Sequence, residues 1–289
     1  MTVAGQGEYY IPNPSPWPIT AMASLLLMLG GTALLINGVT WGGWLTLAGF
    51  LLFTVLLFGW FSDVVKENLT DCYNAQVDRS FRQGMFWFIA SEVFFFLSFF
   101  GALYYIRNVA LPWIGGEGYL GLTHEYLYNQ FQYAWPSAGP EQLGGEFKPM
   151  GAWGIPAINT LILLSSGGTI TWAHWGLKED NQRKLVLGLA ATIALGLVFV
   201  VLQAYEYQHA YADLNLTLES GVYGSTFYML TGFHGFHVTM GAVMLMAILF
   251  RAMKGHFSPH NHFAFEAVAW YWHFVDVVWL GLFVFVYWL

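Results

Sequence analysis

A few ionisable residues lie inside long apolar stretches of the sequence, where a membrane would keep water away. Glu92 is the clearest case, because it lies within the apolar run 84–106, about 12 Å from the start of that run if the run is helical. Ionisable groups in a bilayer cost several kcal/mol, so each is a candidate for function. Since burial disfavours a charged carboxylate, we expect Glu92 to be protonated at neutral pH and to bind a proton functionally. The alternative is a neutral acid that joins two helices by a hydrogen bond.

Histidine and acidic residues recur at helical spacing in two later apolar runs. These residues are His234, His237, Glu266, His273 and Asp276. Residues three apart share one side of a helix, and counting inward from the ends of the runs puts both such pairs near the depth of Glu92. We therefore predict an intramembrane polar cluster that links the third, sixth and seventh helices.

Imidazole and carboxylate groups in a helix bundle can also hold a metal or a haem. Di-iron bundles repeat a Glu-x-x-His motif on two helices, and this sequence has no such repeat. Hydrogen bonding between helices is the commoner role of such residues. We predict no metal ligand, no cofactor and no catalytic residue in this chain, with a stand-alone haem enzyme as an alternative.

The amino-acid composition indicates whether these helices are surrounded by water or by lipid. Hydrophobic residues make up 57% of the 289 residues and charged residues only 9%, whereas soluble domains carry about 25% charged residues. The chain therefore belongs in lipid. A net charge of -7 with only ten scattered Lys and Arg residues excludes a nucleic-acid partner. The single cysteine, Cys72, excludes a disulfide framework and is expected to be a lone thiol in a loop.

Seven apolar runs are long enough to cross about 30 Å of hydrocarbon as helices. They are residues 17–36, 41–65, 84–106, 155–175, 185–207, 222–250 and 262–289. The fold class is an all-α membrane protein with seven transmembrane helices and a long outer loop at residues 107–154. Short cytoplasmic loops are rich in Lys and Arg, and placing the N-terminus inside and the C-terminus outside puts eight of the ten basic residues on the inner side.

Several motifs in order along the chain resemble subunit III of haem-copper cytochrome c oxidases. They are NPSPWP at 13–18, SEV at 91–93, ITWAH at 170–174, QAYEY at 203–207, YGSTF at 223–227, TGFHGFHV at 231–238 and WYWHFVDVVW at 270–279. The resemblance implies that helices 1–2 (residues 1–66) and helices 3–7 (residues 67–289) form two bundles with a V-shaped cleft. Structural phospholipids would occupy this cleft. Glu92 matches the carboxyl group of the family that reacts with carbodiimides.

The resemblance also implies a role within a larger complex. Such a subunit carries no haem or copper, because the redox centres of these oxidases lie in subunits I and II. It supports proton uptake and turnover stability of subunit I, its main contact, beside subunit II and a small extra subunit. Cytochrome c is the substrate of the complex. Six acids on the expected inner surface would gather protons, with solvated loop charges as the alternative: Asp63, Glu67, Asp71, Asp78, Glu179 and Asp180.

Basic and aromatic residues near the inner ends of two helices are candidates for phospholipid binding. They are Arg251, Lys254 and His256 after the sixth span, and Trp60 and Lys66 at the end of the second. The segment 250–256 resembles a lipid-contacting segment of the family, although positive-inside topology explains two of its three basic residues. Asn74 lies near a position where some members have a histidine, which weakens the expectation of lipid contact there.

Two other functions are compatible with a polytopic chain. A quinol oxidase subunit III generally lacks the first two helices, which are present here. A transporter would show broken helices and inverted repeats, which the sequence lacks. The outer loop is longer than in compact mitochondrial members, which favours a bacterial cytoplasmic membrane over the mitochondrial inner membrane.

Overall fold

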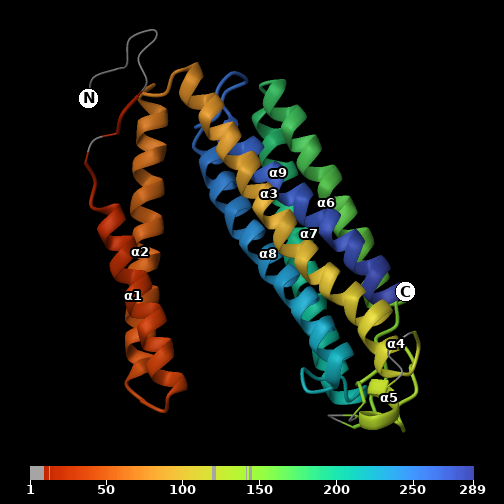
Figure 1. The fold of residues 1–289 in the computed structure, drawn as a ribbon. Coiled ribbons are helices and arrows are strands. Elements are labelled where there is room, and N and C mark those ends of the chain that lie inside the picture. Colours follow the sequence, from red (N-terminus) through yellow and green to blue (C-terminus); the bar gives the residue numbers. More distant parts are fainter. Residues whose placement is uncertain (1–9, 13, 119–121, 141, 143–144) are drawn as a thin grey trace. The chain divides into compact units, whose positions relative to one another are not determined.

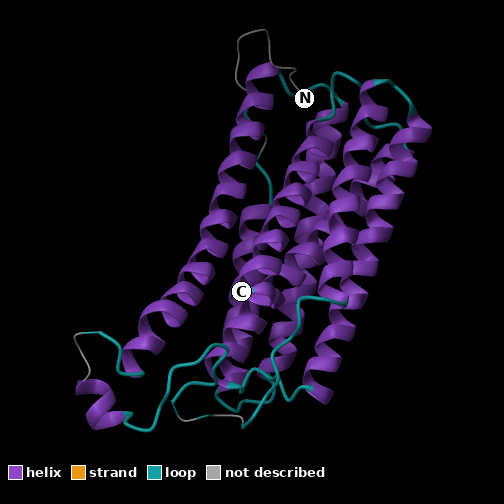
Figure 2. Cartoon of the chain, turned by 90° about the vertical axis from the view of Figure 1, so that its right-hand side faces the viewer, coloured by secondary structure: helices purple, strands orange, loops and turns teal. Residues whose placement is uncertain are grey.

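The computed structural model describes all residues except 1–9, 13, 119–121, 141 and 143–144. The described residues form helices and loops without a β-strand, apart from one isolated antiparallel bridge between Ser258 and Asn261 (Figure 2). The prediction of an all-α protein is confirmed for this part of the chain.

Among the described residues, seven helices have 20 residues or more, and Figure 1 labels each of them. They are α1 (Trp17–Ile36), α2 (Gly42–Leu69), α3 (Ala75–Tyr105), α6 (Ile155–Lys178), α7 (Gln182–Asp213), α8 (Gly221–Met253) and α9 (Phe263–Leu282). The π-helical turn η1 (Ile106–Ala110) and α4 (Leu111–Ile114) continue α3, and η2 (Phe283–Trp288) continues α9. A short helix, α5 (Leu122–Leu127), lies in the predicted outer loop.

Six helices of the described chain are long and apolar enough to cross a membrane. They are α1, α2, α3 with its extension, α7, α8 and α9 with η2. A multi-pass membrane protein is thereby confirmed. The exception, α6, has 24 residues but carries polar residues on its buried side, among them Asn159, Thr160 and Ser166. These residues lower its hydropathy, so its crossing of the membrane stays a prediction.

The third helix begins earlier than its apolar run. The predicted apolar run begins at residue 84, but α3 begins at Ala75. Asn74 explains this start, because its side-chain oxygen accepts hydrogen bonds from the backbone N–H groups of Gln76 at 3.1 Å and Val77 at 3.0 Å. Such a cap satisfies donors that the first helical turn leaves unpaired.

Residues 1–83 form one compact unit, built around the hairpin of α1 and α2. The two helices run antiparallel, since Trp17 at the start of α1 donates a 2.9 Å hydrogen bond to Asp63 near the end of α2. Their backbones touch at glycines. A Cβ atom at Gly31 would lie 2.5 Å from the backbone nitrogen of Thr46. Close approach through small residues is typical of helix pairs in lipid, where van der Waals packing drives association.

Residues 84–289 form a second compact unit, in which α6, α7, α8 and α9 share one core. Trp272 of α9 is fully buried and donates a 2.9 Å hydrogen bond to Ser166 of α6. Its ring lies against Gly196 of α7 and Gly241 of α8, where a Cβ atom would come within 2.6 Å and 2.8 Å of it. One side chain of α9 thus contacts the other three helices, and this packing fixes the rotation of α9.

Candidate functional site

Glu92 and His237 form a polar contact between α3 and α8. The Nε2 atom of His237 lies 2.9 Å from Oε2 of Glu92, and the side chains are 10% and 22% exposed. The Nδ1 atom of His237 lies 2.6 Å from the backbone oxygen of Phe233. A carbonyl oxygen only accepts hydrogen bonds, so Nδ1 must carry a hydrogen. Two arrangements then remain for the contact with Glu92: a glutamic acid that donates to neutral imidazole, or an imidazolium that donates to a carboxylate.

Both arrangements hold one proton between the two side chains and have no net charge. Aromatic rings surround the contact, because the rings of Phe95 and Phe96 lie 5.9 Å and 4.9 Å from the imidazole of His237. An apolar environment disfavours separated charges. The pair can therefore store a proton at an electrically neutral site, which is what a proton-related carboxyl group requires.

His234 shares a helix with His237 but contacts a different neighbour. Its Nε2 atom lies 3.1 Å from the backbone oxygen of Val275 in α9, and its ring lies against Phe199 and Trp279. Three residues along a helix correspond to about 300° of rotation, so side chains at this spacing point about 60° apart. Within the described chain, His234 thus joins α8 to α9 rather than α8 to α3.

His273 and Asp276 of α9 face α6. The Nε2 atom of His273 lies 3.5 Å from the hydroxyl oxygen of Thr171. A Cβ atom built on Gly167 would lie 3.0 Å from Oδ2 of Asp276. The other oxygen of Asp276, Oδ1, has no hydrogen-bond partner among the described residues. The predicted single cluster is thus divided: Glu92 contacts His237, whereas His273 and Asp276 lie between α6 and α9.

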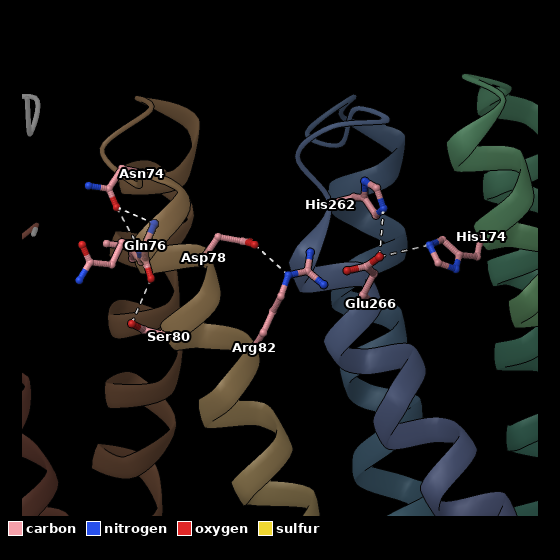
Figure 3. Close-up of polar contacts among 9 residues, drawn as sticks. Asn74, Gln76, Asp78, Ser80, Arg82, His174, His262 and Glu266 are labelled. Carbon is pink, nitrogen blue, oxygen red and sulfur yellow. Dashed lines mark hydrogen bonds and ion pairs between the residues drawn. The ribbon is translucent and has the colours of Figure 1, made fainter. Parts of the chain in front are cut away.

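Glu266 lies apart from these residues, at the start of α9 (Figure 3). Its Oε1 atom lies 3.3 Å from Nε2 of His262 and 3.6 Å from Nε2 of His174, which comes from the end of α6. The prediction placed Glu266 with His273 and missed its contacts with His174 and His262. The spacing of four residues between His262 and Glu266 could have indicated the second contact, because residues four apart are neighbours on a helix.

A buried acid on α7 was not predicted as a site residue. Glu206 is fully buried and accepts a 2.6 Å hydrogen bond from the hydroxyl group of Tyr287 in η2. Its second oxygen, Oε2, has no partner among the described residues. Tyr287 itself is 7% exposed, whereas its neighbour Trp288 is 58% exposed.

Four of the six acids predicted to gather protons accept hydrogen bonds from nearby side chains. The pairs are Asp63 with Trp17 and Lys66, Glu67 with Tyr73, Asp78 with Arg82, and Glu179 with Lys184. Figure 3 shows the pair of Asp78 and Arg82. Burial, together with the hydrogen bond to Glu67, raises the pKa of Tyr73, so this phenol stays protonated and acts as a donor. The pairing favours the alternative of solvated loop charges for these four acids.

The basic residues predicted to bind lipid lie at the end of α8. The guanidinium carbon of Arg251 lies 4.7 Å from the ring centre of Phe257. Nε of Arg251 and Nδ1 of His256 are both buried without a hydrogen-bond partner in the described chain. Partial burial and the positive charges of Arg251 and Lys254 lower the pKa of His256. Unpaired donors beside positive charge suit an anionic group such as a phosphate.

Lys66 and Trp60, the two candidates for lipid binding in the unit of residues 1–83, are more exposed than Arg251 and His256. Lys66 lies 3.5 Å from Asp63, and both side chains are largely exposed. Trp60 is 50% exposed and stacks on Phe61. An exposed indole and a lysine at one helix end are typical of the membrane interface.

The second unit also has an apolar groove of ≈ 320 Å³ on α3 and α9. Its lining residues are Phe86, Ile89, Ala90, Val93, Phe94 and Trp270. Most of these side chains are exposed, so the groove faces the surroundings of the helices. Its chemistry suits a hydrocarbon chain.

Comparison with known proteins gives consistent results. The family described as "Cytochrome c oxidase subunit III" matches residues 7–116 and 128–289. Proteins named "Cytochrome c oxidase subunit 3" from Equus caballus and Oryctolagus cuniculus are each 41% identical to the chain, over 282 and 281 residues. In both cases the similarity covers 97% of this chain and 96% of the relative. The relative from Ornithorhynchus anatinus is equally similar, at 41% over 281 residues.

Proposed function

The chain belongs to the cytochrome c oxidase subunit III family and is thus a subunit of a respiratory oxidoreductase complex, and we propose that it supports proton uptake and turnover stability of subunit I. The observation that carries this proposal is the 2.9 Å contact of Glu92 with His237, which would hold a single proton inside the membrane as a neutral pair. The other oxidase subunits are its partners. Subunit I would be the main contact, beside subunit II and a small extra subunit, with cytochrome c as substrate of the complex.

Electron transfer would proceed in the partner subunits. Glu92 and both ring nitrogens of His237 are engaged in hydrogen bonds with protein groups, which favours a role in packing and proton binding over haem or copper ligation. The haem and copper centres would then belong to subunits I and II, and this chain would influence catalysis through protons alone.

The proposed arrangement in the membrane has seven crossings, with the N-terminus inside and the C-terminus outside. The 24 residues of α6 would span about 36 Å, and its polar residues Asn159, Thr160 and Ser166 are buried rather than exposed to lipid. Helices α1 and α2 would form the first bundle, and the remaining long helices the second, with phospholipid in the V-shaped cleft. The presence of α1 and α2 disfavours a quinol oxidase subunit III, which generally lacks the first two helices.

The relatives reported above are mammalian. This points away from the bacterial cytoplasmic membrane that the long outer loop favoured. That preference is therefore not supported, and a multi-pass membrane protein is what the findings establish.

Removal of the chain from the purified oxidase tests the proposal. The stripped enzyme should reduce oxygen at first, because the redox centres remain, but should take up protons more slowly and lose activity over successive turnovers. The deficit in rate should grow with rising pH, since fewer protons are then available from solution. The measurements are the initial oxygen consumption rate and its decay between pH 6 and pH 9.

Adding back the purified chain provides the control and should restore both quantities. Equal initial rates and equal lifetimes of intact and stripped enzyme at every pH would leave the chain without a role in proton uptake or turnover stability.

We predict that Glu92 holds the shared proton as a carboxylic acid and donates it to His237. The infrared spectrum should then show a protonated carboxyl band that Glu92→Gln removes. His237→Phe should move this band to higher frequency, because the carboxyl group loses its acceptor. A carboxylate band at neutral pH that disappears in Glu92→Gln would contradict the prediction and assign the proton to the imidazole.

We also propose that Arg251, Lys254 and His256 bind the phosphate of an anionic phospholipid. A bound phosphate would offset the positive charges that lower the pKa of His256, so the titration midpoint of His256 should rise when anionic lipid binds. Histidine NMR signals would report this midpoint in anionic and in zwitterionic detergent–lipid mixtures. Bound anionic lipid, counted by native mass spectrometry, should fall in the triple alanine variant but not in Arg183→Ala. An unchanged midpoint together with unchanged bound lipid would refute this site.

The apolar groove on α3 and α9 gives phospholipid binding a second line of support, since its size and lining suit an acyl chain. Trp60 and Lys66 would contact a headgroup at the end of α2. These contacts and the site at Arg251 are proposed as separate lipid positions.

A further inference from the structure

The group of His174, His262 and Glu266 has the composition of a metal site. His174 comes from the end of α6, His262 immediately precedes α9, and Glu266 lies in the first turn of α9. Ligand atoms of the three side chains all lie within 4.8 Å of one another. Two imidazoles and one carboxylate are a common ligand set for Zn²⁺, with a fourth position left for water.

The separations between these atoms are close to those that a tetrahedral ion requires. Bonds of about 2.0–2.1 Å put neighbouring ligand atoms roughly 3.3–3.4 Å apart. Oε1 of Glu266 lies 3.3 Å from Nε2 of His262 and 3.6 Å from Nε2 of His174 (Figure 3). On binding, the 3.6 Å separation would shorten slightly, and the imidazole ligand atoms, which lie within 4.8 Å of each other, would also move closer.

The hydrogen bonds of His262 leave the correct nitrogen available. Its Nδ1 atom lies 3.0 Å from the backbone oxygen of Ser258 and must donate to it. In neutral His262 the lone pair is then on Nε2, which points at an oxygen of Glu266. Two acceptors at 3.3 Å repel unless a proton or a cation lies between them. A ligating histidine whose other nitrogen donates to a carbonyl oxygen is the usual arrangement around a metal ion.

His174 gives an independent indication. Its Nε2 atom is buried and has no hydrogen-bond partner in the described chain, although it faces the carboxylate of Glu266. The side chains of His262 and Glu266 are only 10% and 15% exposed. An unsatisfied buried nitrogen costs free energy, and coordination of a cation would satisfy it.

We propose that His174, His262 and Glu266 bind a Zn²⁺ ion that joins the end of α6 to the start of α9. The three ligands come from two segments of the chain that are far apart in sequence. Binding would hold the segment between α8 and α9 in place, because Ser258 and His262 both belong to it. The remaining coordination position would take a water molecule.

The test measures zinc in the intact oxidase complex after chelation and dialysis against buffered free Zn²⁺. Element-specific analysis should find one Zn²⁺ more per complex in the parent protein than in His262→Ala or His174→Ala. Loss of a hydrogen bond that supports a metal ligand weakens metal binding roughly 10–100-fold. Loss of a ligand itself should weaken zinc binding at least as much. His260→Ala is the matched control, because His260 is an exposed histidine two residues from His262, and this variant should bind zinc like the parent.

Equal zinc content and affinity in all four proteins would overturn the proposal. If the ligand variants fail to assemble, anomalous diffraction from the parent complex at the zinc edge decides the question. A peak within bonding distance of both imidazoles supports the site, and the absence of a peak after zinc soaking rejects it. The loss of activity on stripping the chain is a separate measurement, so failure of the zinc site leaves the proposed function untouched.

Discussion

Trp272→Ala is expected to lower the free energy of unfolding of the second unit by about 3 kcal/mol, the lower end of the range for removing a buried tryptophan. The lower end applies because the unfolded chain meets lipid rather than water, so the lost packing contacts dominate over transfer. Trp272 is fully buried, and Gly196 and Gly241 leave room for its ring. The mutation would empty this space and leave the hydroxyl group of Ser166 without its donor.

Thermal aggregation in a mild detergent, together with loss of helical circular dichroism, measures the effect. Trp172→Ala is the matched control, because Trp172 of α6 is 41% exposed, and its loss should change the transition temperature little. Trp272→Phe should fall between the two, since a ring remains but its hydrogen bond is lost. Transition temperatures that agree between Trp272→Ala and Trp172→Ala would show that the buried indole does not hold α9 in place.

Gly31→Leu is expected to destabilise the hairpin of α1 and α2 by about 3 kcal/mol, the upper end of the cost of overpacking. The new side chain would start 2.5 Å from a backbone nitrogen and 2.8 Å from a backbone oxygen of α2. Backbone atoms cannot rotate away as a flexible side chain can. The two helices would therefore have to separate.

Gly30→Leu is an adjacent control, because a Cβ atom at Gly30 has no neighbour within 4 Å. It also measures the gain in helix propensity of about 1 kcal/mol that both substitutions share. Cys72 reports the outcome, since it is the single cysteine of the chain and is buried in the same unit. A thiol-reactive dye should label it at a lower temperature in Gly31→Leu than in Gly30→Leu. Identical labelling curves would mean that the close approach at Gly31 is dispensable.

The sequence alone determined where most of the membrane helices lie. The first predicted run, 17–36, coincides with α1, and the run 222–250 lies within α8 (Gly221–Met253). The physical reason is that the hydrocarbon thickness fixes the length of an apolar run. The run must also be helical, because a helix satisfies its own backbone N–H and C=O groups, which lipid cannot do. The predicted depth of Glu92 uses the same argument, because helical rise converts residue number into distance.

Helix ends outside the apolar runs were less predictable. The start of α3 at Ala75 depends on the side-chain cap from Asn74, which is a local signal that hydropathy does not contain. For α6, hydropathy failed in the other direction, because the low hydropathy of this helix excludes it from the spans that are apolar enough to cross a membrane. Thr160 and Ser166 of α6 accept hydrogen bonds from Trp279 and Trp272 of α9, so a low hydropathy there reflects helix contacts rather than exposure to water.

Only the tertiary structure decided which polar residues meet. Helical spacing shows that His234 and His237 lie near one another, but not which neighbouring helix each one faces. Packing of Trp272 against Gly196 and Gly241 contributes to the rotation of the helices in the second unit. That rotation brings His237 to Glu92 and places Glu266 beside His174, two contacts between residues 145 and 92 positions apart. A single sequence specifies the angles within each helix, whereas the angles between helices depend on how all their side chains fit together.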